Sequence, residues 1–349
     1  MPYHRLPETV QTLYAELLEQ ATHAEAEAAA AGVPPGSFVA KRIKGATYWY
    51  LQRTEGERKR QRYLGRESSA LLAWMEGVRQ ARARSAGDEV QRTQLCAMLA
   101  AGGAARESAA VTKVLELLAE AGVFRLGGVL VGTQAFSAYG NLLGVRFDKQ
   151  ALRTQDVDIA QDLAIGIALS RETSPANVEE SLEASSLGFF PVPALDPRAP
   201  STSFKIRGRD LRVDFLTPLF GPESGKPVFL PALEVSAHPL RFLDYLIEQP
   251  AQAVLVGGAG ILVNVPDPAR FAFHKLWISR RRPVSEQTKA AKDLRQAGDL
   301  LEVLLEDRPG DLALAREALR RHPPAWKAVV AAIRRLPPEV QEGLEPLSA

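Results

Sequence analysis

The sequence predicts an α+β protein in which an N-terminal helix and a three-stranded meander precede a mixed core, and a C-terminal helical region follows it. Three observations carry this prediction. Apolar residues recur at helical spacing over residues 6–31, β-branched and aromatic residues crowd residues 37–65, and short apolar runs alternate with helix-like segments from residue 109 onward. The predicted domains are 1–105, 106–266 and 267–349.

Composition narrows the class of protein. The chain has 349 residues, 46% of them hydrophobic and 24% charged, with a formal net charge of +2, all ordinary for a globular protein. The single cysteine, Cys96, excludes an intramolecular disulfide. No run approaches the ~20 apolar residues that span a bilayer, and the first ten residues lack the apolar segment of a signal peptide. We therefore expect a cytoplasmic protein with no membrane partner.

Several helices are predicted around the meander. Residues 6–31 form one helix that ends at a Gly-Pro cluster. Residues 68–84 and 88–101 are typical of two helices that are separated at Gly87, where a Ser-Ala-Gly sequence suggests a break. Residues 109–121 follow with a broad apolar stripe.

The meander is unusually basic and aromatic, and two interpretations stay open. Cations for phosphate and rings for base stacking favour a nucleic-acid-binding sheet. A small sheet also needs aromatic packing to be stable, so the rings can equally lie on a packed face with the cations in solvent. The residues in question, between Lys41 and Arg66, are Lys41, Arg42, Lys44, Arg53, Arg58, Lys59, Arg60, Arg62 and Arg66, with Tyr48, Trp49, Tyr50 and Tyr63.

The chain centre joins a short apolar run, 126–131, to a helix-compatible segment, 135–143, through Gly132 and Thr133. Glycine permits close backbone approach to a ligand, and a helix N-terminus offers free N–H groups to an anion. Such strand–glycine–helix joints are common, so this one alone is a weak indication of a phosphate site.

An acidic pair, Asp156 and Asp158, follows on a second apolar run. Residues i and i+2 of a strand point to the same side, so the two carboxylates would lie side by side with Val157 and Ile159 turned into the core. Adjacent carboxylates repel unless a cation lies between them, and oxygen ligands suit Mg²⁺ or Mn²⁺. The alternative is an exposed strand end with two solvated aspartates.

A third acid favours the metal site. Residues 203–206 and 211–216 predict a hairpin, and Asp214 lies inside its apolar second strand. A carboxylate on a central strand is rarely buried without a partner. A site shared with Asp156 and Asp158 would supply one.

At these residues the sequence resembles the nucleotidyltransferase superfamily of the DNA polymerase β type. That pattern is a Gly-Ser or Gly-Gly turn between a strand and a helix, a D-x-D pair, and a third acid on a neighbouring strand. Gly132-Thr133, Asp156-x-Asp158 and Asp214 match it. The likeness runs from about residue 37 to 305 and is nearest to uncharacterised bacterial nucleotidyltransferase-fold proteins with an N-terminal segment like GATYWYLQ…RQRYLG.

Two departures from the pattern are visible. Thr133 stands where serine is usual, which keeps the hydroxyl. The interval from Gly132 to Asp156 is long, which predicts an inserted loop over residues 141–154.

The resemblance implies a mechanism and a set of roles. Asp156, Asp158 and Asp214 would hold two Mg²⁺ or Mn²⁺ ions, and Gly132 and Thr133 would cradle the phosphates of an NTP. The implied reaction moves an NMP from the NTP to a hydroxyl of RNA, protein or a small molecule.

The C-terminal third adds basic candidates. A helix is expected from Pro268, and Lys275 lies within its apolar stripe. Abortive-infection and toxin-type relatives carry a similar arrangement, which implies that Lys275 contacts the triphosphate, with Arg280 or Arg281 and the Lys292-Asp293 pair nearby. The alternative for these others is a solvated helix pair with i, i+4 ion pairs. Further predicted elements are a helix at 238–248, a strand pair at 254–256 and 261–265, and short helices at 312–321, 325–335 and 338–347.

Two other functions compete with an active transferase. The basic meander is compatible with a nucleic-acid-binding protein whose transferase core is catalytically silent. The C-terminal resemblance alone also implies a toxin or phage-defence effector.

Overall fold

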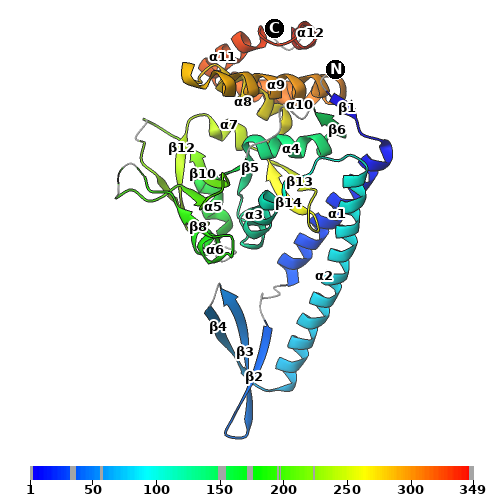
Figure 1. Ribbon diagram of the computed structural model, residues 1–349, viewed down its shortest axis with the longest axis vertical. Coiled ribbons are helices and arrows are strands. Elements are labelled where there is room, and N and C mark those ends of the chain that lie inside the picture. The colour runs from blue at the N-terminus through cyan, green and yellow to red at the C-terminus, as the bar shows by residue number, and fades with distance from the viewer. Residues whose placement is uncertain are drawn as a thin grey trace.

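The computed structural model describes residues 3–31, 37–55, 58–147, 155–170, 176–194, 196, 198–222 and 225–345. It confirms the α+β class. The meander lies at one end, the mixed core lies in the middle, and the C-terminal helices cover the other end (Figure 1).

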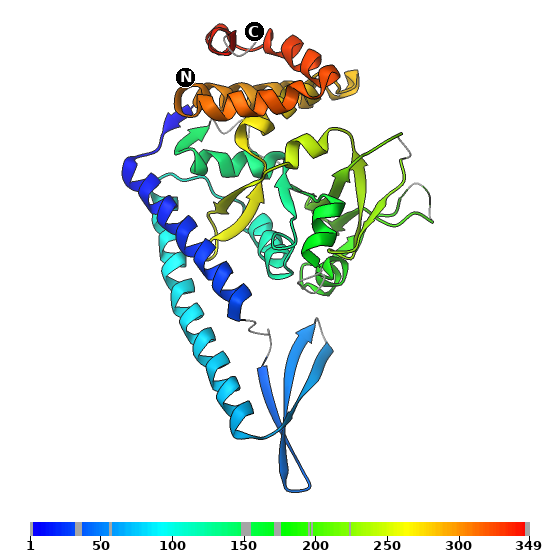
Figure 2. The same cartoon turned by 180° about the vertical axis from the view of Figure 1, so that it is seen from behind.

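The N-terminal part is built from two long helices and the meander. The two helices lie side by side, and the meander occupies their far end (Figures 1 and 2). The three strands pair antiparallel in the order β2-β3-β4, so the predicted meander is confirmed. The elements are β1 (Tyr3–Arg5), α1 (Glu8–Ala31), β2 (Ser37–Ile43), β3 (Ala46–Glu55), β4 (Arg58–Arg66) and α2 (Ser69–Ala101).

The predicted break at Gly87 is wrong, because α2 is one helix of 33 residues. The Ser68 side chain caps its start by accepting a hydrogen bond from the Leu71 N–H, and the helix ends at Gly102. A glycine inside a helix costs only about 1 kcal/mol relative to alanine. The packing of α2 along α1 offsets that cost, so local sequence does not break the helix.

The core is a mixed sheet flanked by helices. Its main path runs β11-β12-β10-β7-β5, and β9 and β8 extend from the side of β10. Strands β7, β10 and β12 are parallel, whereas β5 is antiparallel to β7. The elements are α3 (Ala109–Glu120), β5 (Val129–Val131), α4 (Gly132–Leu142), β6 (Val145–Phe147), β7 (Asp156–Ala160), α5 (Leu163–Ser170), α6 (Val178–Ala184), β8 (Phe189–Pro191), β9 (Ser203–Ile206), β10 (Arg212–Pro218), β11 (Val228–Leu230) and β12 (Val235–Leu240).

The helix predicted at 238–248 is confirmed only in its second half, because residues 238–240 belong to a strand. Residues 235–240 form β12, and only α7 (Leu243–Ile247) is helical. Pro239 explains the difference, because proline breaks a helix interior yet fits a strand position that needs no N–H donor. At Pro239 the strand pairs with β10 alone, since its pairing with β11 stops at Ala237.

The predicted loop at 141–154 is described only in part. Helix α4 reaches Leu142, and β6 then pairs antiparallel with β1, with Tyr3 opposite Phe147. Residues 148–154 lie outside the described part of the chain.

The last elements close the fold. Strands β13 (Ala251–Leu255) and β14 (Ile261–Val265) form the predicted hairpin, which packs on α1. There the Tyr14 hydroxyl accepts a hydrogen bond from the Val254 N–H at 3.1 Å.

The predicted domain boundaries at 105 and 266 remain predictions. Among the described residues, no helix combines the length and the apolar character that a bilayer span requires. The C-terminal helices are α8 (Pro268–Ser279), α9 (Gln287–Asp307), α10 (Pro309–Arg320), α11 (Pro323–Ile333) and α12 (Pro338–Leu344).

Candidate active site

The three predicted carboxylates lie on one face of the core sheet. Asp156 and Asp158 alternate along β7 with Val157 and Ile159, which are buried as predicted. Strands β7 and β10 are parallel, and Asp214 lies directly opposite Asp158 in their register. Paired residues of neighbouring strands project to the same side. The parallel pairing thus brings residues 56 positions apart in the chain into one acidic group.

Gly132 allows Asp158 to sit against the start of α4. Its φ is +68°, a conformation that glycine adopts without strain, and a Cβ placed there would collide with the Asp158 carboxylate. Helix α4 begins at Gly132 itself, and no side chain caps it. The free N–H groups of its first turn are therefore available to an anion beside Asp158.

Asp214 is already hydrogen-bonded. Its Oδ1 accepts from the Arg212 Nε at 2.7 Å and from the Ser203 hydroxyl. Arg212 also donates to the Ser203 Oγ at 2.8 Å, which closes a three-member network. One oxygen of Asp214 is therefore already held by Arg212 and Ser203, on the same face of the sheet as Asp156 and Asp158.

Burial and repulsion shift the protonation of Asp158. Desolvation is the main cause, and the charges of Asp214 and Asp156 add to it, which together raise the pKa of Asp158 to about 6. The Lys275 charge lowers it in part. An acid held in this way favours a cation, because a bound cation would stabilise the ionised form.

The donor set fits Mg²⁺ or Mn²⁺ in its chemistry, because it consists only of carboxylate oxygens. The fit is incomplete in geometry. Within the ranges that the structure describes, no three His, Cys, Asp or Glu side chains converge closely enough to hold an ion. For Asp214 to join Asp156 and Asp158 around a metal, its carboxylate would have to turn away from Arg212.

A cavity of about 320 Å³ separates Asp156 and Asp158 from a basic wall. Gly132, Thr133, Asp156 and Asp158 line one side of it. The other side belongs to α8, α9 and the connection between them. Its charged residues are Lys275, Arg282, Lys289, Lys292 and Asp293.

Lys275 lines this cavity but does not lie free within it. Its Nζ is 2.6 Å from Oδ1 of the buried Asp293, whose Oδ2 accepts from the Arg282 Nε at 3.0 Å. The predicted contact of Lys275 with a triphosphate stays a prediction. Arg280 and Arg281 do not line the cavity, and the Arg281 guanidinium lies 5.0 Å from the centre of the Trp277 ring.

Lys292 reaches the predicted phosphate turn. Its Nζ donates to the Thr133 hydroxyl at 3.1 Å. Burial, followed by the neighbouring charge of Lys275, lowers the pKa of Lys292. Two cations thus lie close together beside the uncapped start of α4, where an anion would relieve their repulsion.

Two family profiles match parts of the sequence. The sequence profile of a family described as nucleotidyltransferase matches residues 109–320, more than half of the chain. The chain belongs to this nucleotidyltransferase family. A second profile, described as a domain of unknown function, matches residues 4–73. No curated protein and no solved structure matches the sequence.

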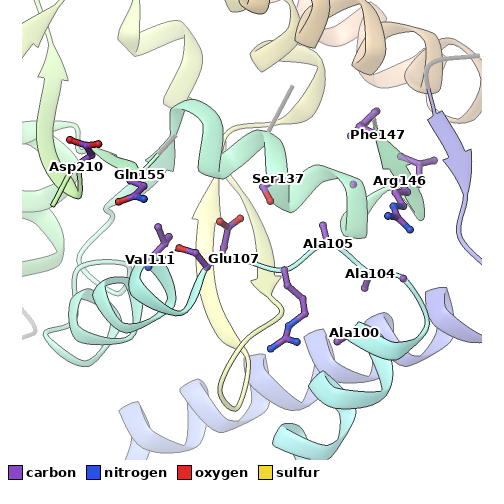
Figure 3. Close-up of a pocket in the computed structure, with 15 residues that line it drawn as sticks. Ala100, Ala104, Ala105, Glu107, Val111, Ser137, Arg146, Phe147, Gln155 and Asp210 are labelled. Carbon is purple, nitrogen blue, oxygen red and sulfur yellow. Dashed lines mark hydrogen bonds between the residues drawn. The ribbon is translucent and has the colours of Figure 1, made fainter. Parts of the chain in front are cut away.

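The nucleotidyltransferase has a second, larger cavity of about 780 Å³, beneath α4 (Figure 3). Glu107 points into it toward Ser137. Burial raises the pKa of Glu107, and its Oε1 has no hydrogen-bond partner among the described residues. Gln155, which precedes Asp156, lines the far end, so this cavity approaches the start of the acidic strand.

Sequence reasoning missed Arg282 and Lys289 in the first cavity and Glu107 in the second. Lys289 stands three residues before Lys292 on α9, a spacing that places the two on one helix face, and this was the available signal for Lys289. Glu107 gave no comparable signal. The connection that carries it is fixed by Asn141, whose side chain pairs with both backbone groups of Ala105 at 2.7 and 2.9 Å.

Proposed function

We propose that this nucleotidyltransferase transfers an NMP from an NTP to a hydroxyl acceptor with the help of Mg²⁺ or Mn²⁺. One observation carries the proposal. Asp156 and Asp158 of β7 lie across a single cavity from a basic wall that reaches the uncapped start of α4, and Asp214 of β10 stands opposite Asp158. Cations on one side and anions on the other are what a metal-bound triphosphate requires.

The acidic side would hold the metal. Asp156 and Asp158 provide adjacent oxygens, and Asp214 would join them once it releases Arg212. The bound ion would neutralise phosphate charge and lower the pKa of the attacking hydroxyl.

The basic side would hold the triphosphate. The N–H groups at the start of α4 and the Thr133 hydroxyl would bind phosphate oxygens, and Lys292 would add charge. Asp293 keeps the Lys275 ammonium and the Arg282 guanidinium in place. Lys275 would thereby act on the phosphates as a fixed charge at short range.

The proposed reaction requires only that the acceptor carries a hydroxyl group. RNA, a protein and a small molecule each carry one. If residues 41–66 bind nucleic acid, they would bring RNA to the transferase core.

Labelling tests the proposal. Purified protein would be incubated with each of the four NTPs, labelled at the α-phosphate, together with Mg²⁺ or Mn²⁺ and cell extract. We expect one or more acceptors to be labelled, and we expect Asp156→Ala and Asp158→Ala to abolish the label while the melting temperature shows a folded protein. Asp88→Asn is the matched control, because Asp88 is an exposed carboxylate on α2. Labelling that persists in both Asp→Ala variants would refute the proposal.

A second candidate is a nucleic-acid-binding protein with a silent core. The engagement of Asp214 by Arg212 and Ser203 favours it, because it occupies one of the three carboxylates. Absence of label with every NTP and both metals would support this candidate. The toxin or phage-defence role stays a prediction, and growth arrest that depends on Asp156 would test it.

A further inference from the structure

The meander (β2, β3 and β4) has two chemically different faces. Residues that pair directly across neighbouring strands share a face, and successive residues alternate. Tyr50 pairs with Val39 on one side and with Tyr63 on the other, while Leu51 pairs with Phe38. Tyr50 and Leu51 therefore point in opposite directions, and each defines one face.

The Leu51 face is the packed one. Leu51 is buried, and the Phe38 ring lies edge-on to Trp74 of α2 with the ring centres 5.6 Å apart. The Arg82 guanidinium, also on α2, lies 5.3 Å from the centre of the Phe38 ring. This face alone gives the sheet the apolar support that three strands need.

The opposite face, which we call the tyrosine face, consists of Tyr48, Tyr50 and Tyr63 with Lys41 beside them. The Tyr63 ring centre lies 5.4 Å from that of Tyr50 and 6.3 Å from that of Tyr48. The Lys41 Nζ lies 4.7 Å from the centre of the Tyr50 ring. Tyr63 is 54% exposed. A solvent-facing side of a sheet is usually polar, so three clustered rings there require a function or a partner.

Charge identifies the partner. Residues 37–67 contain nine Lys or Arg and three Glu, whereas the whole chain has a net charge of only +2. Lys41, Arg42, Arg62 and Arg66 are all exposed. Arg66 pairs with Tyr48 and so shares the tyrosine face. A strongly basic surface attracts a polyanion more strongly than it attracts an apolar protein surface or one with few acidic residues.

We propose that the tyrosine face binds single-stranded nucleic acid. Its rings would stack on unpaired bases, and Lys41 and Arg66 would contact the phosphates between them. Stacking needs bases that are free of a duplex, which is why a single strand fits better than a double helix. The meander stands apart from the core at the end of the two long helices (Figures 1 and 2), so this binding uses none of the residues proposed for nucleotidyl transfer.

The test measures binding of the full chain to fluorescent oligonucleotides by anisotropy. The probes are a 12-nucleotide single-stranded RNA, the matching DNA, the DNA duplex, and a DNA strand of the same charge with abasic sites in place of its bases. We expect tighter binding to the single strands than to the duplex, and weaker binding to the abasic strand. Preference for the duplex, or equal binding to the abasic strand, would overturn the proposal.

Variants separate stacking from charge. Tyr63→Ala should weaken binding about 5- to 150-fold, whereas Tyr63→Phe should retain it, because a phenyl ring still stacks. Lys41→Gln should lower the slope of log K against log salt by about 0.7, the contribution of one phosphate contact to a single strand. Phe229→Ala and Lys327→Gln are the matched controls, since both residues are exposed and lie outside the meander.

Folding is controlled in the same samples. Each variant should keep the wild-type circular dichroism spectrum and melting temperature, since the altered side chains are on the unpacked face. If folded Tyr63→Ala binds as tightly as the wild type, or if the wild type fails to bind any probe at low salt, the tyrosine face is not a nucleic-acid site.

Discussion

The Lys292 ammonium donates a hydrogen bond to the Thr133 hydroxyl over 3.1 Å and so joins the C-terminal helices to the first turn of α4. The two residues are 159 positions apart in the chain. Their contact places the Lys292 ammonium beside the proposed phosphate turn. The proposed nucleotide site therefore depends on α9 as well as on the strand–helix joint.

Lys292→Gln should weaken NTP use while sparing the fold. Glutamine removes the charge but can still donate to Thr133, so only the phosphate attraction is lost. We expect the KM for NTP to rise about tenfold, the effect of one charge-assisted hydrogen bond of about 1.4 kcal/mol. Steady-state labelling kinetics would measure it, with Lys327→Gln as the control. An unchanged KM would place the triphosphate away from α9.

Gly132→Ala should damage both stability and transfer. The positive φ disfavours alanine, and its Cβ would collide with the Asp158 carboxylate. We expect a loss of about 1–3 kcal/mol in the free energy of unfolding, measured with urea, together with loss of labelling.

A second glycine provides the matched control for Gly132→Ala. Gly87 lies within α2 with open space around its Cα. Gly87→Ala should raise stability by about 0.5–1 kcal/mol, because alanine is the better helix former. If Gly87→Ala lowers the free energy of unfolding, α2 is not a continuous helix. If Gly132→Ala changes neither stability nor labelling, Asp158 does not need its position against α4.

His274 should make the protein sensitive to acid. Burial and the adjacent Lys275 lower its pKa to about 3, whereas a histidine in the unfolded chain titrates near 6.5. The unfolded state thus binds more protons between these values. The contribution of His274 to stability is present above pH 6.5 and is lost as the pH falls toward 3, by about 1 kcal/mol per pH unit in the middle of the range.

His274→Phe should flatten this dependence. Phenylalanine keeps an aromatic ring between Phe242 and Trp277 and cannot take up the proton. Urea unfolding at pH 7, 6, 5 and 4 would compare the two proteins. His23→Phe is the control, because that side chain is 73% exposed. Parallel curves for the wild type and His274→Phe would contradict the prediction.

The acidic residues could be predicted from the sequence because local patterns along the strands were enough to identify them. Alternation on a strand places Asp156 and Asp158 together, and an acid in an apolar run, Asp214, signals a partner. The parallel pairing of β7 with β10 depends on long-range contacts that no local pattern contains. Only the structure shows that Asp214 stands opposite Asp158 and that Arg212 already binds it.

The errors in the fold have the same origin. Tertiary packing keeps α2 continuous through Gly87, against the local preference for a break. Strand pairing takes residues 238–240 into β12, although the predicted helix included them. For the meander, composition gave both possible placements of the aromatic residues, and the cross-strand register decides that the tyrosines lie on the side away from α2.

Metal binding should follow the titration of Asp158. Without a metal the pKa of Asp158 is about 6. At pH 5 the Asp158 carboxyl is therefore ionised in only about a tenth of the molecules, whereas at pH 7.5 it is ionised in nearly all of them. Because a carboxylate must be deprotonated to bind Mg²⁺, we expect affinity about tenfold lower at pH 5 than at pH 7.5. Calorimetric titration of the NTP-free protein would measure both values. Asp158→Asn should abolish the binding at both pH values, and Asp88→Asn should leave it unchanged. Equal affinity at the two pH values, or Mg²⁺ binding that survives Asp158→Asn, would remove Asp158 from the metal site without touching the role of Lys292 at the triphosphate.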